Sequence, residues 1–142
     1  MITGTALWYA SRATGVISLI LLSSVAILGI VVSRQGRLPG LPRFAVTGLH
    51  RSLSLLTVAF LGIHIVTAIA DGYVHIPWLS TVVPFTSDYE RFWIGLGTVA
   101  VDMVAAVIIT SLLRARLRPS VWRAVHWLSY ASYPVVVIHS LG

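Results

Sequence analysis

Residues 45–70 read AVTGLHRSLSLLTVAFLGIHIVTAIA, and this stretch decides the fold of the chain. It is long enough to cross a bilayer, which requires about 20 consecutive apolar residues in a helix. It nevertheless carries two histidines, His50 and His64, in an i, i+14 relationship. An ionisable side chain in hydrocarbon costs free energy, so its presence inside such a segment indicates a functional site.

A second stretch repeats this arrangement near the end of the chain. Residues 122–141 read WRAVHWLSYASYPVVVIHSL and carry His126 and His139, in an i, i+13 relationship. Residues 8–32 and 92–113 are also apolar and long enough to span. Because backbone groups in lipid must be hydrogen-bonded within their own segment, each stretch is predicted to be a helix. The chain is therefore expected to be one all-α transmembrane domain, residues 1–142, with helices at about 8–32, 45–70, 92–113 and 122–141.

The composition supports a membrane protein and excludes several kinds of metal chemistry. Of 142 residues, 57% are hydrophobic and only 10% are charged, and the mean hydropathy is +0.91. The absence of cysteine excludes disulfides, iron–sulfur clusters, thiolate ligation of haem and covalent haem attachment. The net charge of +6 comes from arginines in short loops, which points to membrane topology and lipid contact and not to nucleic acid.

The arginines divide the loops into two kinds. The first loop is basic and contains Arg34, Arg37 and Arg43, and the third loop is basic and contains Arg114, Arg116 and Arg118. The second loop is acidic and contains Asp71, Asp88 and Glu90. Because positive residues favour the cytoplasmic side, the basic loops are expected inside and both termini outside. This gives an up-down-up-down four-helix bundle, multi-pass in a plasma membrane that we expect to be bacterial. No basic region precedes residues 8–32, so a retained helix is favoured over a signal peptide.

In this topology the helices at 45–70 and 122–141 run parallel, which pairs the histidines by depth. His50 and His126 lie near the cytoplasmic face, and His64 and His139 lie near the outer face. The separations along the two helices are about 21 and about 20 Å. A six-coordinate haem iron needs two axial ligands, so four histidines at two matched depths predict two non-covalent b-type haems.

The directions of the side chains are less regular than their depths. On an ideal helix, a step of i+14 returns to within about 40° of the starting direction, whereas a step of i+13 misses it by about 140°. Pro134 lies between His126 and His139 and removes a backbone hydrogen bond. A bend or local rewinding of the helix at Pro134 is expected to turn the His139 side chain towards the direction of His126.

Other readings of these histidines remain open. A transition-metal transporter lined by histidine is the main rival, although a zinc site gathers three or four ligands in one place. His75, in the acidic loop, is expected to be a surface residue. That loop either covers the outer surface as a lid or simply connects two helices. Asp102 lies mid-way along residues 92–113 and either relays protons, tunes a haem, or is a neutral hydrogen-bonded acid.

Further candidates for cofactor binding flank the histidines. Arg12, Arg51 and Arg123 are candidates for haem propionates, because the guanidinium fork suits a carboxylate. They could equally set topology and extend to lipid headgroups. Gly48 and Gly62 each precede a histidine by two residues, which is compatible with close approach of a flat macrocycle or with ordinary helix packing.

The stretch LHRSLSLLTVAFLGIH at residues 49–64, together with WRAVHWLSYASYPVVVIH at residues 122–139, resembles the ferric reductase-like transmembrane domain. That family includes ferric reductases, NADPH oxidases and the haem subunit of methionine sulfoxide reductase systems. The resemblance implies that His50, His64, His126 and His139 ligate two b haems, and it covers essentially the whole chain.

Many members of that family have six helices followed by a flavin and nicotinamide domain. This chain is expected to have four helices, and no G-x-G-x-x-G motif is present. It therefore resembles the haem-bearing core, an oxidoreductase component without its own nucleotide domain, and either a separate flavin or quinol donor supplies electrons or the chain is a fragment. An outer acceptor would receive the electrons. A terminal reductase acting on ferric iron or oxygen at the outer haem is the alternative, and no oligomeric state is predicted.

Overall fold

The computed structural model describes residues 2–142, with side chains from residue 4 onward. These residues form helices and connecting loops, with one isolated bridge between Leu38 and Leu41 and no strand among them. The chain divides into two compact units, Met1–Tyr73 and Val74–Gly142. The prediction of an all-helical fold is therefore confirmed, and each unit is described below by itself.

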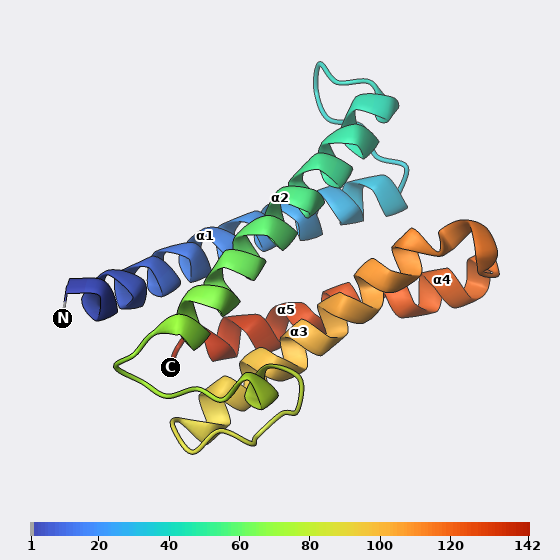
Figure 1. Ribbon diagram of the computed structural model, residues 1–142. Coiled ribbons are helices and arrows are strands. Elements are labelled where there is room, and N and C mark those ends of the chain that lie inside the picture. The colour runs from blue at the N-terminus through green and yellow to red at the C-terminus, as the bar shows by residue number, and fades with distance from the viewer. Residues whose placement is uncertain (1) are drawn as a thin grey trace. The chain divides into compact units, whose positions relative to one another are not determined.

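The first unit is an antiparallel pair of long helices, α1 (Ile2–Ser33) and α2 (Arg43–Ala70), which lie side by side in Figure 1. The turn between them contains Gly40 at φ +75, a left-handed conformation that favours glycine. At the other end of α2, the carboxylate of Asp71 accepts a hydrogen bond from the backbone N–H of Tyr73 at 3.0 Å. Such a turn offers the backbone an alternative to the helix, and α2 ends there.

The second unit contains α3 (Arg91–Leu112) and two shorter helices that return beside it, α4 (Pro119–His126) and α5 (Leu128–His139). Two 3₁₀ turns, η1 (Trp78–Thr81) and η2 (Arg114–Arg116), lie in the loops. In the described residues, α1, α2 and α3 are the helices long and apolar enough to cross a membrane. The parallel course of α2 and the last helical segment, and the four-helix bundle, stay predictions.

The fourth predicted helix is not one continuous helix, and this corrects the sequence analysis. The expected helix at 122–141 begins three residues earlier, with Pro119 at a first-turn position that tolerates its missing N–H. It is interrupted at Trp127, between α4 and α5. There the Ser129 hydroxyl donates to the carbonyl of His126 at 2.7 Å, while the N–H of Tyr130 bonds to the carbonyl of Trp127 at 3.0 Å.

The irregularity thus lies at Trp127 and not at Pro134, where it was expected. A bond from a residue to the carbonyl three positions before it tightens the backbone locally into a 3₁₀ turn. Pro134 itself is accommodated within α5. Another difference is at the start of α1, which begins at Ile2 and not near Trp8.

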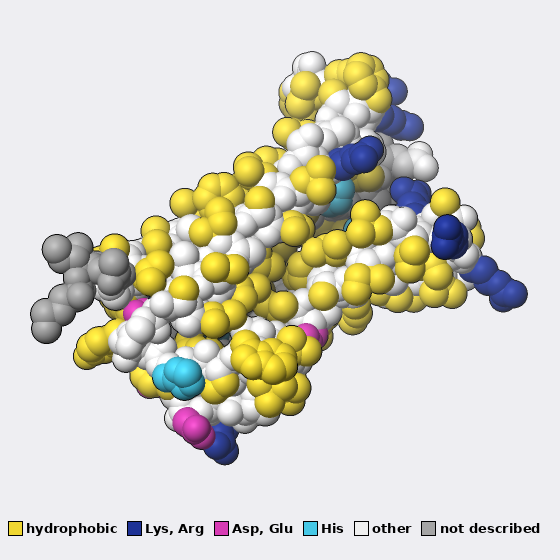
Figure 2. Space-filling model, in the orientation of Figure 1, with side chains coloured by type: hydrophobic (Ala, Val, Ile, Leu, Met, Phe, Trp, Pro, Cys, Tyr) yellow, Lys and Arg dark blue, Asp and Glu magenta, His cyan; other side chains and the backbone are white. Residues whose placement is uncertain are grey.

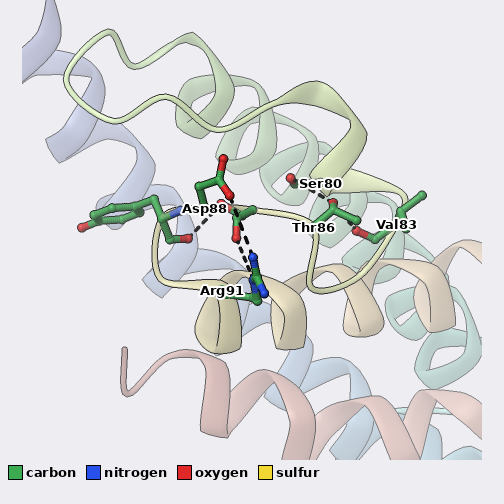
Figure 3. A network of polar contacts seen from close by, with 7 residues as sticks. Ser80, Val83, Thr86, Asp88 and Arg91 are labelled. Atoms are coloured by element: carbon green, nitrogen blue, oxygen red, sulfur yellow. Dashed lines mark hydrogen bonds and ion pairs between the residues drawn. The ribbon is translucent and has the colours of Figure 1, made fainter.

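The acidic loop is folded onto the start of α3 (Figure 3). The Thr98 hydroxyl on α3 donates to the carbonyl of Ser80, and Thr86 donates to the Ser80 hydroxyl at 3.1 Å. The Arg91 guanidinium donates to the carbonyl of Ser87 at 3.3 Å and lies 3.9 Å from the carboxylate of Asp88. Ser80 and Ser87 are buried. The loop is therefore an ordered cap on α3, held by more than its two ends.

The surfaces of the helices are apolar along most of their length (Figure 2). Exposed aliphatic side chains include Ile20 and Ile27 on α1, Leu55 and Val66 on α2, and Ile109 on α3. Such continuous apolar surface is uncommon on soluble proteins and is what contact with lipid requires. Arginine side chains gather at the loop ends of the helices, as expected for residues that fix topology.

Candidate functional site

His50 and His64 lie on the face of α2 that packs against α1. The Nδ1 atom of His64 is 2.8 Å from the carbonyl oxygen of Ser11, and Nδ1 of His50 is 3.2 Å from the carbonyl oxygen of Val25. Ser11 and Val25 have the same i, i+14 spacing on α1 as the two histidines have on the antiparallel α2. The prediction that His50 and His64 share a face is confirmed.

His139 makes the same contact in the second unit. Its Nδ1 atom is 2.7 Å from the carbonyl oxygen of Trp93, near the start of α3. The last residues of the chain pack here as well, because the Trp93 ring fills the space that a Cβ on Gly142 would occupy. The C-terminal end of α5 is thereby placed against the N-terminal end of α3.

These three contacts define which ring nitrogen carries the proton. A backbone carbonyl oxygen can only accept a hydrogen bond, so Nδ1 of His50, His64 and His139 must donate one. A neutral imidazole protonated at Nδ1 has its lone pair on Nε2. Histidines that bind metals are held in the same way, with the second nitrogen donating to a carbonyl or carboxylate that orients the ring.

His126 is oriented by stacking. It is the last residue of α4, and its ring lies 4.8 Å from the Trp122 ring, with 26° between the two planes. The Arg114 guanidinium lies 4.2 Å from the centre of the same Trp122 ring. An aromatic pair and a cation over an aromatic face are both favourable arrangements. His75, by contrast, is exposed in the acidic loop, and its prediction as a surface residue is confirmed.

Two glycines on the neighbouring helices lie directly beneath histidine rings. A Cβ added at Gly15 would lie 3.0 Å from Cε1 and 3.1 Å from Nδ1 of His64. A Cβ added at Gly97 would lie 2.7 Å from Cε1 and 3.1 Å from Nδ1 of His139. Gly15 and Gly97 were not among the residues predicted from the sequence. A signal was present, because Gly15 and Gly29 repeat the i, i+14 spacing of His50 and His64.

The glycines that the sequence analysis did single out are placed differently. Gly48 and Gly62 are exposed on α2, and a Cβ added at either would meet none of the described atoms within 4 Å. Two residues correspond to about 200° on a helix, so each lies almost opposite the histidine that follows it. Their approach to a macrocycle stays a prediction.

The three candidate arginines are all exposed. Arg12 follows Ser11 on α1, and its guanidinium lies 4.9 Å from the centre of the Trp8 ring. Arg51 directly follows His50, and the Nε–H of Arg123 donates to the carbonyl of Pro119 at 3.4 Å. Their contacts with propionates stay predictions. Asp102 is also exposed, on α3.

The donor chemistry of these histidines fits a haem iron. Within residues 2–142, no three His, Asp or Glu side chains gather in a way that could hold a bare metal ion. A haem iron needs no such cluster, because the porphyrin occupies four positions and the protein supplies the axial ligands. Imidazoles oriented through Nδ1, as in His64 and His139, have the protonation state that an axial ligand requires.

Comparison with known proteins agrees with this chemistry. A family model described as "Ferric reductase like transmembrane component" matches residues 14–137. The match includes His50, His64 and His126 and ends two residues before His139. No curated protein and no solved structure matched the chain.

Proposed function

Because the chain belongs to the ferric reductase-like transmembrane family, we propose that it transfers electrons across the plasma membrane through two non-covalent b haems. His50 and His126 would ligate one iron, and His64 and His139 the other. A separate flavin or quinol protein would be the electron donor on the cytoplasmic side or in the membrane. An acceptor on the outer side would receive the electrons.

One observation supports this proposal above the others. Three of the four histidines direct Nδ1 at a backbone carbonyl of the antiparallel neighbouring helix: Ser11 for His64, Val25 for His50, and Trp93 for His139. This common orientation through backbone carbonyls leaves the lone pair of Nε2 free to bind a metal in these three histidines.

The residues around each histidine have defined tasks. The carbonyl oxygens hold the rings in one orientation and keep the proton at Nδ1. This makes Nε2 a stronger electron-pair donor to a metal. Trp122 fixes the plane of the His126 ring by stacking. A bound haem would supply a one-electron ferric/ferrous couple, and the apolar helices would keep water and other reactants from it.

The length of α2 suits transfer across the membrane. His50 and His64 are separated by about 21 Å along the helix axis. This is roughly two-thirds of the ~30 Å hydrocarbon core, so ligands on one helix reach towards both faces. The proposal that electrons travel outward rests on the arginine-rich loops, which favour the cytoplasmic side.

Haem quantification of the purified full chain tests the proposal. A pyridine haemochrome assay is expected to find two b haems per chain, extractable with acidified acetone because no cysteine attaches them. His75→Leu is the matched control, because His75 is exposed in the acidic loop, and it should keep both haems. A colourless preparation from haem-replete cells that contains zinc or copper instead would overturn the proposal and favour a metal transporter.

A further inference from the structure

We propose that Gly15, Gly29 and Gly97 are positioning residues, each of which uncovers the backbone carbonyl that orients a histidine ligand. The proposal rests on the proposed function for the identity of the bound group. The orientation and the tautomer of each imidazole, however, are properties of the chain and do not depend on which group is bound. The three glycines act on His64, His50 and His139 respectively.

The register of an α-helix relates each backbone carbonyl to the residue four positions later. The carbonyl of residue i accepts the N–H of residue i+4, and the Cβ of residue i+4 leans back over the preceding turn towards that carbonyl. A side chain at i+4 therefore covers one side of the carbonyl oxygen. A glycine at i+4 leaves the second lone pair of that oxygen open to a neighbouring helix.

All three histidine contacts have this register. The carbonyl that contacts each histidine belongs to the residue four positions before one of these glycines, in the pairs Ser11 with Gly15, Val25 with Gly29, and Trp93 with Gly97. The three pairs occur on two different helices, α1 and α3. The same spacing in separate parts of the chain indicates a common physical requirement.

The distances show what a methyl group would do at Gly97. An ideal Cβ there would lie 2.7 Å from Cε1 of His139 and 3.1 Å from both ring nitrogens. Carbon atoms pack at roughly 3.5–4.0 Å, so the ring would have to retreat by about 0.8 Å. Because the Trp93 carbonyl lies on the same helix as Gly97, a ring that retreats from Gly97 also moves away from the backbone of α3, and its 2.7 Å contact with that carbonyl is expected to lengthen.

Gly15 is a milder case of the same contact. Its added Cβ would lie 3.0 Å from Cε1 and 3.1 Å from Nδ1 of His64, so a smaller retreat of the ring would suffice. The His64 contact with Ser11 is 2.8 Å and would lengthen by less. Gly4, on the same helix, offers a matched comparison, because its added Cβ would meet only the Asp71 carboxylate at an ordinary 3.9 Å.

The fourth histidine, His126, does not show this combination of a glycine and a carbonyl contact. Ser111, and not glycine, occupies the i+14 position relative to Gly97 on α3. The carbonyl four positions before it, that of Val107, accepts the hydroxyl of Thr110 at 3.2 Å. His126 is instead stacked on Trp122. The inference is therefore restricted to the three histidines for which both the glycine and the carbonyl contact are present.

The consequence for the bound group is a shift of redox potential. A hydrogen bond from Nδ1 to a carbonyl increases the donor strength of Nε2, and a stronger donor favours the ferric state. Lengthening that bond should raise the potential of the affected haem only. With the proposed ligand pairs, Gly15→Ala and Gly97→Ala act on the same haem, and Gly29→Ala acts on the other.

The test compares Gly97→Ala and Gly15→Ala with Gly4→Ala in the purified full chain. In a redox titration, one component should move to higher potential in Gly97→Ala, by less in Gly15→Ala, and not at all in Gly4→Ala. In haem-free protein, ¹⁵N NMR of the imidazoles should show the tautomer protonated at Nδ1 for His64 and His139, and a mixture at His139 in Gly97→Ala.

The outcomes separate this inference from the proposed function. If the wild-type chain binds no haem, the proposed function fails, and the NMR measurement on haem-free protein still decides the role of the glycines. If both alanine variants match Gly4→Ala in potential and in tautomer, the inference is overturned. If Gly97→Ala does not fold, Gly15→Ala decides alone, by the same two measurements.

Discussion

The cap formed by the acidic loop allows a quantitative prediction for Thr98→Val. The Thr98 side chain is 4% exposed, and its hydroxyl donates to the carbonyl of Ser80, a residue that is 1% exposed. Valine has nearly the same shape and cannot donate. Leaving a buried acceptor unsatisfied costs about 1–3 kcal/mol. Since about 1.4 kcal/mol is a factor of ten, the population with an open cap should rise about 5- to 150-fold.

Limited proteolysis with chymotrypsin measures this opening, because Phe85 and Tyr89 lie in the cap. When the cap closes faster than the protease cleaves, the cleavage rate follows the open population. Thr110→Val is the matched control on the same helix, since the Thr110 hydroxyl donates only to carbonyls of its own helix, those of Ala106 and Val107. Equal cleavage rates in the two variants would refute the anchoring of the cap by Thr98.

Three further predictions concern orientation and the surroundings of the haems. Fusions of a periplasm-active reporter should be active after Gly142 and inactive at Gly36, because the arginine-rich loops favour the cytoplasm; the opposite pattern would reverse the proposed electron flow. Arg12→Leu should lower the potential of the outer haem, because removing a nearby cation disfavours an added electron, and Arg12→Lys should restore it; identical titrations would show that Arg12 serves only lipid contact. Trp122→Leu should speed haem loss from the His126 site to apomyoglobin by about 2- to 12-fold, from a stacking free energy of about 0.5–1.5 kcal/mol, and an unchanged rate would remove Trp122 from the site.

The three long helices could be predicted from the sequence because each contains a run of about 20 mostly apolar residues, the length that crosses a bilayer. The predicted ends of α2 and α3 fall within two residues of those in the structure. The break at Trp127 could not be predicted from hydropathy, since it depends on one hydroxyl, that of Ser129, competing for the carbonyl of His126. The interruption was expected at Pro134, but Pro134 lies within α5 and does not interrupt it.

The sequence indicated which histidines are candidate ligands, and it did not indicate the groups that hold their rings. Spacing alone placed His50 and His64 on one face, as the contacts with α1 confirm. The supporting groups are backbone carbonyls, whose identity leaves no mark on a sequence. Their only trace is the glycine four residues later, as at Gly15 and Gly97. That trace becomes meaningful once the partner helix and its register are known.

The cap was also predictable from the sequence only in part. Its acidic residues, in contrast to the arginines of the other two loops, predicted a loop on the outer side. Its ordered structure depends on specific contacts, such as those from Thr98 and Thr86 to Ser80, that join residues far apart in the sequence. The same holds for the Phe85 ring, which fills the space that a side chain at Gly95 would occupy. Composition favours neither a lid nor a plain connection, and a role as a lid stays a prediction.

The most direct test of the two-haem proposal is a redox titration, followed by absorption, of four variants: His50→Leu, His126→Leu, His64→Leu and His139→Leu. Each iron depends on its own pair of ligands, so losing either ligand should remove or convert one haem and leave the other. The account predicts that His50→Leu and His126→Leu lose the same redox component, and that His64→Leu and His139→Leu lose the other. If His50→Leu instead matches His139→Leu, the proposed pairing is wrong, and if no variant changes the spectrum, these histidines are not the ligands.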